Sequence, residues 1–321
     1  MPAAVQDPLE IVRLAGILKA GGLVAFPTET VYGLGADATN SAAVLSIYET
    51  KGRPRFNPLI VHCADLAMAE TLVAFTPLAR RLAARFWPGP LTLVLPRKPG
   101  SPLSDLVTAG LDTVGVRVPA HPLTQALIRA AGMPLAGPSA NPSGRLSPTA
   151  AAQVRSYFGG RVPVLDGGPC TAGVESTILA IRDDAAIQLR AGALPRDEIE
   201  AEIGRPVAVA AAGAAVAAPG MLASHYAPAA ALRLDAAAPR PGEAFLGFGP
   251  MPAAIAGVSR NLSPSGDLRE AARNLFSMLH ELDGEAAAIA VAPIPQTGLG
   301  EAINDRLRRA AAPRDQLSRT L

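Results

Sequence analysis

Four clusters of polar residues follow short apolar runs in the first half of the chain, where strands are expected to end in loops. The first is "FPTETVYGLGADA" (26–38), in which hydroxyls, a carboxylate and a phenol follow the run "GGLVAF". The others are "KGRPRFNPLIVH" (51–62), "TAGLDTVGVRVP" (108–119) and "GPSANPSGRLSPT" (137–149). Ligands collect at strand ends in open α/β sheets, so these clusters are candidates for a single binding site.

The second cluster carries the clearest chemistry, because Lys51, Arg53 and Arg55 share a run stiffened by two prolines. A guanidinium group forms paired hydrogen bonds to a phosphate, and an ammonium group acts as a point charge. Taken alone, Lys51 is best explained as a basic residue at a solvated helix end. The whole run, with the amide of Asn57, favours a polyphosphate.

The other clusters leave alternatives open. Arg117 lies between apolar neighbours, and its anion is either a protein carboxylate such as Glu29 or a carboxylate of a ligand. Ser139 and Asn141 fit an uncharged anion cradle as well as an ordinary turn. His62 ends an apolar run, which is typical of a buried core histidine. From the residues alone we expect a pocket for a nucleotide and a small acid, with no reaction assigned.

Several classes of protein are disfavoured by composition. The net charge of +2 gives no electrostatic signature of tight nucleic-acid binding. The two cysteines and four histidines have no metal-ligand or disulfide spacing. The phosphate-binding motif G-x-x-x-x-G-K-[ST], the dinucleotide motif G-x-G-x-x-G after a strand and the G-x-S-x-G elbow are all missing. No apolar run reaches the ~20 residues of a membrane-spanning helix, and no signal peptide is expected, so the predicted location is the cytoplasm.

The elements that must position the clusters alternate between helical and extended patterns. Apolar spacing of three and four predicts helices over 8–22, 41–52, 66–75, 77–87, 121–132, 147–160, 195–204, 266–284 and 299–312. Extended runs predict strands at 23–26, 58–63, 91–96, 113–119, 133–140, 162–168, 175–181, 186–192, 231–235, 243–249 and 286–293. Because several strands are adjacent, we expect an α/β fold with a twisted, mixed sheet flanked by helices.

Composition also divides the chain. A run without charge, rich in Ala, Gly and Pro, begins after Arg205 and ends at Pro228. We therefore predict a first domain over 1–204, a flexible linker over 205–228 and a small α/β domain over 229–321. Ser41 is the expected N-cap of the helix over 41–52.

Taken together, the four clusters, "FWPGPLTLVL" and "GGPCTAGVESTI" resemble the YrdC-like threonylcarbamoyl-AMP synthases in order and spacing, over about residues 10–204. "PGMLASHYAP" and "GLGEAINDRLRRAA" resemble the linker and C-terminal domain of the long, two-domain form. The resemblance implies a YrdC-like sheet followed by a Rossmann-like domain. It also implies synthesis of threonylcarbamoyl-AMP from L-threonine, bicarbonate and ATP, with release of pyrophosphate, for modification of the adenosine next to the anticodon of tRNA.

The resemblance also assigns roles to residues. It implies that Arg117 binds the carboxylate of threonine, within a set that comprises Thr30, His62, Arg117 and Ser176. It implies contacts to ATP from Lys51, Arg53, Asn57, Thr113, Ser139, Asn141, Ser147, Arg190 and Tyr226. Of these, Lys51 and Arg53 are the predicted catalytic residues, and Tyr226 is expected to close over the nucleotide.

No protein ligand for a metal is expected, and Mg²⁺ should arrive on the phosphates of ATP. The expected partners are ATP, L-threonine, bicarbonate and a downstream tRNA-modifying transferase complex, with possible weak contact to tRNA and none to a membrane. Two alternatives remain at this stage. One is an RNA- or tRNA-binding module without synthase activity. The other is a carbamoyl transferase that uses carbamoyl phosphate.

Overall fold

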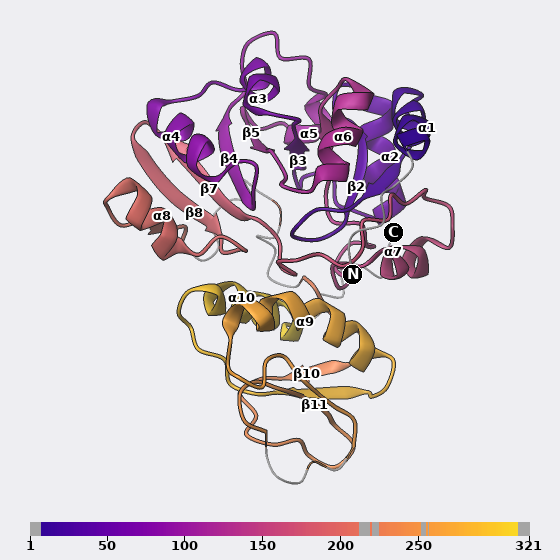
Figure 1. Ribbon diagram of the computed structural model, residues 1–321, viewed down its shortest axis with the longest axis vertical. Coiled ribbons are helices and arrows are strands. Elements are labelled where there is room, and N and C mark those ends of the chain that lie inside the picture. Colours follow the sequence, from indigo (N-terminus) through magenta and orange to yellow (C-terminus); the bar gives the residue numbers. More distant parts are fainter. Residues whose placement is uncertain (1–7, 212–218, 220–224, 252–254, 256, 314–321) are drawn as a thin grey trace.

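Two sheets with their own helices lie one above the other in the computed structural model (Figure 1). The structure describes residues 8–211, 219, 225–251, 255 and 257–313. Part of the predicted linker, residues 212–218 and 220–224, therefore lies outside the described residues. Within the described part, no helix is long and apolar enough to cross a membrane.

The larger sheet has nine strands and is mixed, as the sequence predicts. In spatial order the strands are β1 (Val24–Phe26), β2 (Gly33–Asp37), β6 (Leu135–Ala136), β3 (Ile60–His62), β5 (Thr113–Arg117), β4 (Leu91–Pro96), β7 (Thr177–Arg182), β8 (Ala185–Arg190) and β9 (Ala208–Val209). The pairs β3·β5, β4·β7 and β8·β9 are parallel, and the other neighbours are antiparallel.

Helices pack on this sheet through two apolar clusters. Helices α1 (Pro8–Lys19) and α6 (Pro122–Ala131) form one cluster with β1 and β6. The other cluster holds the buried faces of α2 (Ser41–Lys51), α3 (Leu66–Leu72), α4 (Pro77–Phe86), α5 (Asp105–Thr108), α7 (Ala151–Phe158) and α8 (Arg196–Ile203). The N-cap prediction for α2 was wrong: the side chain of Asn40, not Ser41, accepts hydrogen bonds from the first-turn amides.

The segment 26–38 is not the continuous loop that the sequence indicated, because Gly33–Asp37 folds back on β1 as strand β2. Gly33 and Gly35 lie against the ring of Phe26, and a Cβ atom at either position would approach that ring to 2.6 or 2.7 Å. The two glycines therefore make room for Phe26 within the hairpin. The predicted strand over 162–168 is also absent, and only Val164 forms an isolated bridge, to Ala25.

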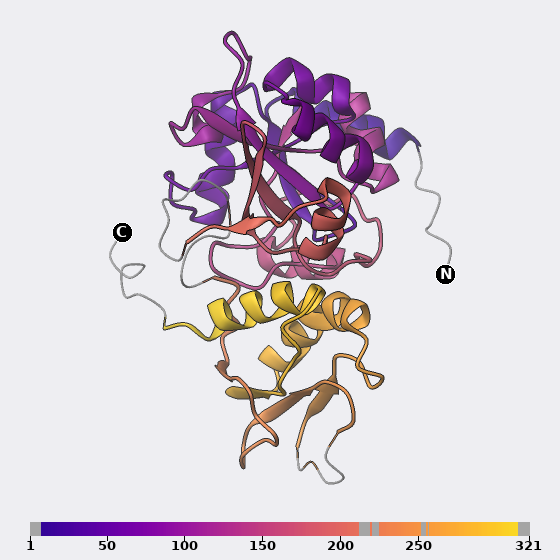
Figure 2. The ribbon, with the colours of Figure 1, turned by 90° about the vertical axis from the view of Figure 1, so that its left-hand side faces the viewer.

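The smaller sheet is entirely parallel, in the order β10 (Ala231–Arg233), β13 (Ala288–Val291), β11 (Ala244–Gly247) and β12 (Ser259–Asn261). Helices α9 (Leu268–Asp283) and α10 (Leu299–Ala311) cover the face of this sheet that is turned toward the larger unit, as the two ribbon views agree (Figures 1 and 2). Strand β9 lies inside the predicted linker but pairs with β8, so the larger sheet extends past the boundary at 204.

The two units share an apolar cluster. Val31, Leu146 and Val174 of the larger unit belong to the same buried cluster as the inner faces of α9 and α10. Tyr226, from the segment between the units, is also part of it. The loops that carry the first and fourth polar clusters are thus packed against the second domain.

Candidate functional site: a basic pocket between the sheet and the second domain

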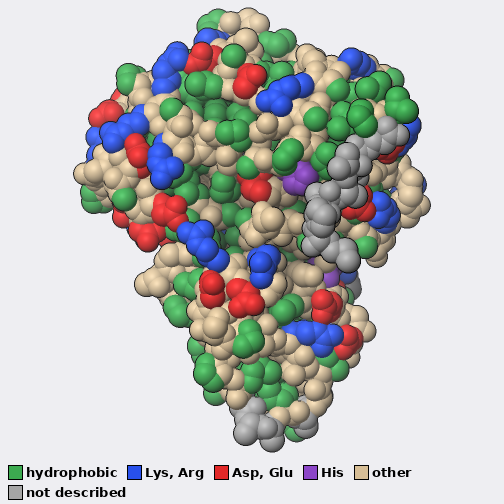
Figure 3. All heavy atoms as spheres, viewed as in Figure 1, with side chains coloured by type: hydrophobic (Ala, Val, Ile, Leu, Met, Phe, Trp, Pro, Cys, Tyr) green, Lys and Arg blue, Asp and Glu red, His purple; other side chains and the backbone are tan. Residues whose placement is uncertain are grey.

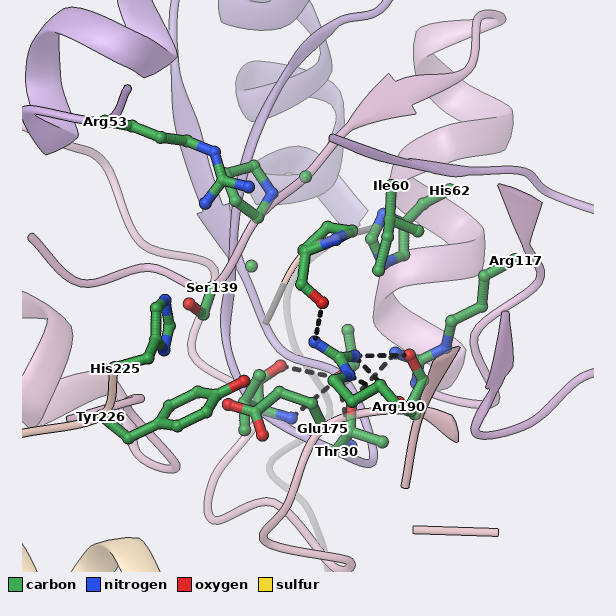
Figure 4. Close-up of a pocket in the computed structure, with 17 residues that line it drawn as sticks. Thr30, Arg53, Ile60, His62, Arg117, Ser139, Glu175, Arg190, His225 and Tyr226 are labelled. Carbon is green, nitrogen blue, oxygen red and sulfur yellow. Dashed lines mark hydrogen bonds between the residues drawn. The ribbon is translucent and has the colours of Figure 1, made fainter. Parts of the chain in front are cut away.

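A pocket with about 530 Å³ of empty space, part of it open solvent, lies where the polar clusters meet. Figure 4 shows Arg53, Ser139 and His225 on one side of it and His62 and Arg117 on the other. Its lining comprises Thr28, Thr30, Val31, Gly33, Arg53, Ile60, His62, Arg117, Gly137, Pro138, Ser139, Glu175, Ser176, Arg190, Pro219, His225 and Tyr226.

Arg117 is fixed at one end of the pocket by three hydrogen bonds. Its guanidinium donates to Glu29 at 2.6 Å, to the hydroxyl of Thr30 at 2.9 Å and to the backbone carbonyl of Gly89 at 3.1 Å. Of the two alternatives that the sequence left open, the protein carboxylate is present, since Arg117 pairs with Glu29, and Arg117 also lines the cavity. With five N–H donors, the guanidinium retains capacity for a ligand carboxylate.

His62 stands beside Arg117, because the two residues are paired across β3 and β5. Its ring packs edge-on against Phe26 at 5.4 Å, and Gly137 leaves the room for both rings. Burial, and secondly the charge of Arg117, lower the pKa of His62 to about 3. The neutral imidazole keeps a buried Nδ1 atom without a partner in the described structure, so it can accept or donate a hydrogen bond to a ligand.

Three further cations are associated with the pocket and nearly fully buried: Arg53 and Arg190 line it, and Lys51 does not. Lys51 donates to the carbonyls of Ser139, at 2.6 Å, and Asn141, and so ties α2 to the fourth cluster. Arg53 donates to the carbonyl of Asn57 at 3.1 Å.

Arg53 also donates to the carbonyl of Pro58, at 2.8 Å. Arg190 donates to the carbonyl of Ser176 at 2.8 Å and to its hydroxyl at 3.2 Å. The guanidinium groups of Arg53 and Arg190, which are distant in sequence, are thus both held by hydrogen bonds to backbone carbonyls.

These three cations have no carboxylate partner among the ion pairs of the described residues, although burying a charge without a counter-charge is costly. Burial and the neighbouring Arg53 place the pKa of Lys51 well below its usual range, and burial lowers the pKa of Arg53 to about 10. Burial and the same cations lower the pKa of His225. Such a concentration of positive potential is complementary to an anionic ligand.

The structure brings most of the predicted site residues together. Thr30, Arg53, His62, Arg117, Ser139, Ser176, Arg190 and Tyr226 line the pocket. Five others do not line it. Lys51 and Asn141 donate to the carbonyl of the lining residue Ser139, and Ser147 donates to the lining residue Glu175. The carbonyl of Asn57 accepts a hydrogen bond from Arg53. Thr113 begins β5, at the other end of that strand from Arg117.

The buried amide of Asn57 has neither its oxygen nor its nitrogen in a hydrogen bond within the described structure. Such a group favours a ligand contact, because an unpaired buried amide is costly.

Sequence reasoning missed several residues of this site. Glu175 and His225 line the pocket. Glu175 directly precedes the predicted residue Ser176, and His225 directly precedes Tyr226. This proximity in the sequence was the feature that could have indicated them. Arg306 of α10 reaches the site from the second domain and is only 1% exposed. Its spacing from Ile303 and Leu307 places it on the apolar face of α10, where a charged residue is unusual.

The fold and the pocket define a class: an α/β protein that binds an anionic ligand between a mixed sheet and a second, smaller domain. Residues 16–192 match the family model of Sua5, YciO and YrdC, which is described as telomere recombination. Residues 194–312 match a second model, described as the C-terminal domain of threonylcarbamoyl-AMP synthase. The chain belongs to the Sua5–YciO–YrdC family, in the two-domain form of the threonylcarbamoyl-AMP synthases.

Relatives support this over nearly the whole chain. The threonylcarbamoyl-AMP synthase of Bacillus subtilis is 42% identical, covering 96% of this chain and 94% of its own. The crystal structure of P. abyssi Sua5 complexed with L-threonine superposes with a TM-score of 0.87 at 38% identity, and 95% of each chain is covered. The crystal structure of E. coli YciO has the same fold over 59% of this chain, with a TM-score of 0.53 and 22% identity.

The neutral, buried histidine predicts a pH dependence of stability. Between an unfolded pKa near ~6.5 and the folded pKa of about 3, the unfolded chain binds a proton at His62 that the folded chain does not. The free energy of unfolding should therefore fall as pH drops below ~6.5, by up to about 1.4 kcal/mol per pH unit from this residue.

Urea unfolding of the wild type and of His62→Asn at several pH values between 5 and 8 checks this. The variant should have the shallower dependence on pH. Parallel curves for the two chains would remove His62 as the source.

Proposed function

We propose that this chain is a threonylcarbamoyl-AMP synthase, which joins L-threonine, bicarbonate and ATP and releases pyrophosphate. The observation that carries the proposal is the joining of two subsites in one pocket. One is polar, around Arg117, His62 and Thr30, and the other is basic and carries the guanidinium groups of Arg53 and Arg190. Relatives of this name over nearly the full length, and the L-threonine complex of P. abyssi Sua5, support the same reaction.

The threonine subsite is proposed to comprise Thr30, His62, Arg117 and Ser176. Arg117 would bind the carboxylate through the donors that Glu29 and Thr30 do not use. The free Nδ1 atom of His62 is suited to the side-chain hydroxyl of threonine. Ser176, held by Thr92 at 2.8 Å, supplies a further buried hydroxyl.

The nucleotide subsite is proposed to comprise Lys51, Arg53, Asn57, Thr113, Ser139, Asn141, Ser147, Arg190 and Tyr226. Arg53 and Arg190 would contact phosphates directly, since both line the pocket and lack a carboxylate partner among the described residues. Lys51 would act through the two carbonyls it holds, which position the loop of Ser139 and Asn141. Tyr226 would cover the nucleotide.

The proposed reaction requires that the reactants be positioned and that the charge on the phosphates be neutralised. The amine of threonine displaces water from bicarbonate to give a carbamate, and a carbamate oxygen then attacks the α-phosphate of ATP while pyrophosphate leaves. Holding the reactants in line and balancing the charge that develops on the phosphates can account for much of the acceleration. Because a carbamate decomposes in water, the cover from the second domain matters for yield.

Mg²⁺ is part of this proposal as a companion of ATP. No group of three or more histidine, cysteine, aspartate or glutamate side chains in the described residues could hold a metal ion. The phosphates would therefore carry Mg²⁺ into the basic subsite, where it supplies charge neutralisation.

The product is an activated acyl donor, so a transferase that consumes it is expected downstream, for the adenosine next to the anticodon of tRNA. Direct contact with tRNA remains part of the proposal. On the face shown in Figure 3, basic and acidic side chains are interspersed over the described residues rather than gathered by sign. Contact through this face would accordingly be weak.

Mass spectrometry tests the proposal. The chain is incubated with ATP, L-threonine and ¹³C-labelled bicarbonate, and the expected product is threonylcarbamoyl-AMP carrying the label. A matched reaction with carbamoyl phosphate in place of ATP and bicarbonate tests the carbamoyl transferase alternative. Absence of a labelled adenylate, with unlabelled ATP recovered intact, contradicts the proposed function.

Arg53→Ala is expected to reduce turnover much more than stability. Loss of a charge-assisted contact to a phosphate in a protected site costs on the order of 1.5–3 kcal/mol, or roughly 10- to 100-fold in rate or affinity. Threonine-dependent pyrophosphate release and thermal melting are measured on the same preparation. Arg55→Ala, in the same run, is the control. A variant that melts early while its folded fraction keeps full activity would make Arg53 structural.

A further inference from the structure

The second domain is in contact with the walls of the pocket. A Cβ atom on Gly173 would lie 2.4 Å from the backbone of Ala272 and Arg273, so α9 rests directly on the loop that leads to Glu175. Val174, the next residue, is buried in the apolar cluster of the second domain. The second domain therefore packs against the segment that carries Glu175 and Ser176.

Arg306 is a buried charged residue that crosses this boundary. It lies on the inner face of α10, only 1% exposed. Its Nε donates to the carboxylate of Glu175 at 2.7 Å, and its two terminal nitrogens donate to Asp305 at 2.6 Å and to the carbonyl of Ala191 at 2.9 Å. The guanidinium carbon also lies 5.1 Å from the centre of the Tyr226 ring.

Glu175 is the pocket-lining partner of this arginine. One carboxylate oxygen accepts from Arg306, and the other accepts from the hydroxyl of Ser147 at 2.5 Å. Arg190, also in the pocket, donates instead to Ser176 and to the carbonyl of Pro219. Among the described ion pairs, Glu175 pairs with Arg306 and not with Arg190.

We propose that Arg306 is a positioning residue that engages the carboxylate of Glu175 and thereby leaves the guanidinium of Arg190 available for a phosphate of the nucleotide. This rests on the proposed function, which places ATP beside Arg190. It gives the second domain a defined part in the reaction, performed by a residue that does not line the pocket. The loop of Ser147 is positioned through the same carboxylate.

The charge state of Glu175 agrees with this arrangement. Burial raises the pKa of Glu175, but the charges of Arg306 and Arg190 together with the hydrogen bonds from Ser147 and Arg306 outweigh burial, and the net pKa is lowered. Tyr226, Asp305, His225 and Arg53 are further titratable groups that face this assembly. Glu175 therefore stays ionised at neutral pH. Without Arg306, the nearby cation left to it is Arg190.

A cycle of three variants tests the proposal: Arg306→Gln, Glu175→Gln and the double variant. Arg308→Gln, an exposed position on the same helix, is the control. KM for ATP and for threonine, and kcat, are measured by pyrophosphate release.

We expect Arg306→Gln to raise KM for ATP by roughly 10- to 100-fold, and KM for threonine by less, because Glu175 then competes for Arg190. Glu175→Gln should have the smaller effect, and the double variant should regain about tenfold or more of the lost ATP affinity.

A purely structural role for Arg306 would make the double variant no better than Arg306→Gln, and this overturns the proposal. A KM for ATP that is the same in Arg306→Gln as in Arg308→Gln also overturns the proposal. If Arg306→Gln does not fold, the double variant decides. A KM for ATP of the double variant within about threefold of that of Glu175→Gln supports the proposal, and any higher KM contradicts it.

Calorimetric titration of ATP into the same proteins separates this inference from the proposed function. A wild type that binds ATP but releases no pyrophosphate would count against the reaction only. Binding that is unaffected by Arg306→Gln would count against the role of Arg306, whatever the reaction.

Discussion

Valine is expected to be a substrate at least about 10⁴-fold poorer than threonine, measured as kcat/KM for pyrophosphate release. The polar groups of the proposed subsite are buried, and the Nδ1 atom of His62 has no partner within the described structure. A ligand without a hydroxyl would leave such groups unpaired, which is far more costly than the loss of a methyl group. Serine, which keeps the hydroxyl, should fall only ~10- to 200-fold below threonine.

His62→Phe is the matched variant for this experiment, because it keeps an aromatic ring against Phe26 while removing both ring nitrogens. It should reduce the preference for threonine over valine. Equal rates with threonine and valine in the wild type would eliminate the hydroxyl contact and leave only the carboxylate contact of Arg117.

Removal of the second domain should reduce threonine-dependent pyrophosphate release by about 100-fold or more, since small displacements of positioning groups have effects of that order. A chain ending at Ala210 retains β9 and the main apolar cluster of the first unit, so it is expected to fold. It exposes Val31, Leu146 and Val174 and lacks Tyr226, all of which share the cluster of the second domain.

The truncated chain should therefore melt at a lower temperature, and its pocket loops should lose their support. Tyr226→Ala in the full chain is the companion variant and should show a weaker defect of the same kind. Full activity of the truncated chain, with circular dichroism that shows it folded, would assign the second domain a different purpose.

The architecture of the first unit was largely predictable, because its strands are apolar runs with clear ends. The errors have local causes. Gly33–Asp37 contains two glycines, which are poor strand formers, and its pairing with β1 depends on the ring of Phe26 filling the space above them. Strand β9 has two residues and forms by pairing with β8, so the alanine-rich composition concealed it.

The site was predictable as clusters but not as contacts. Motif order placed Arg53, Arg117 and Ser139 together correctly, and the pocket confirms that they meet. Lys51 donates to two backbone carbonyls and does not line the cavity. This orientation depends on the position of the loop that carries Ser139, which cannot be deduced from spacing along the chain. Arg306 was missed for the same reason, because its partner Glu175 is distant in sequence.

The cations that the structure places in the lining of the pocket are all arginines, although the chain also has lysines at 19, 51 and 98. The proposed product is a mixed anhydride, and an uncharged amine beside it would be carbamoylated. A guanidinium group stays protonated at neutral pH and is no nucleophile. Lys51, the one of these lysines that is buried, holds its nitrogen against the carbonyls of Ser139 and Asn141. The enzyme can therefore retain an acylating agent without presenting it with an amine of its own to modify.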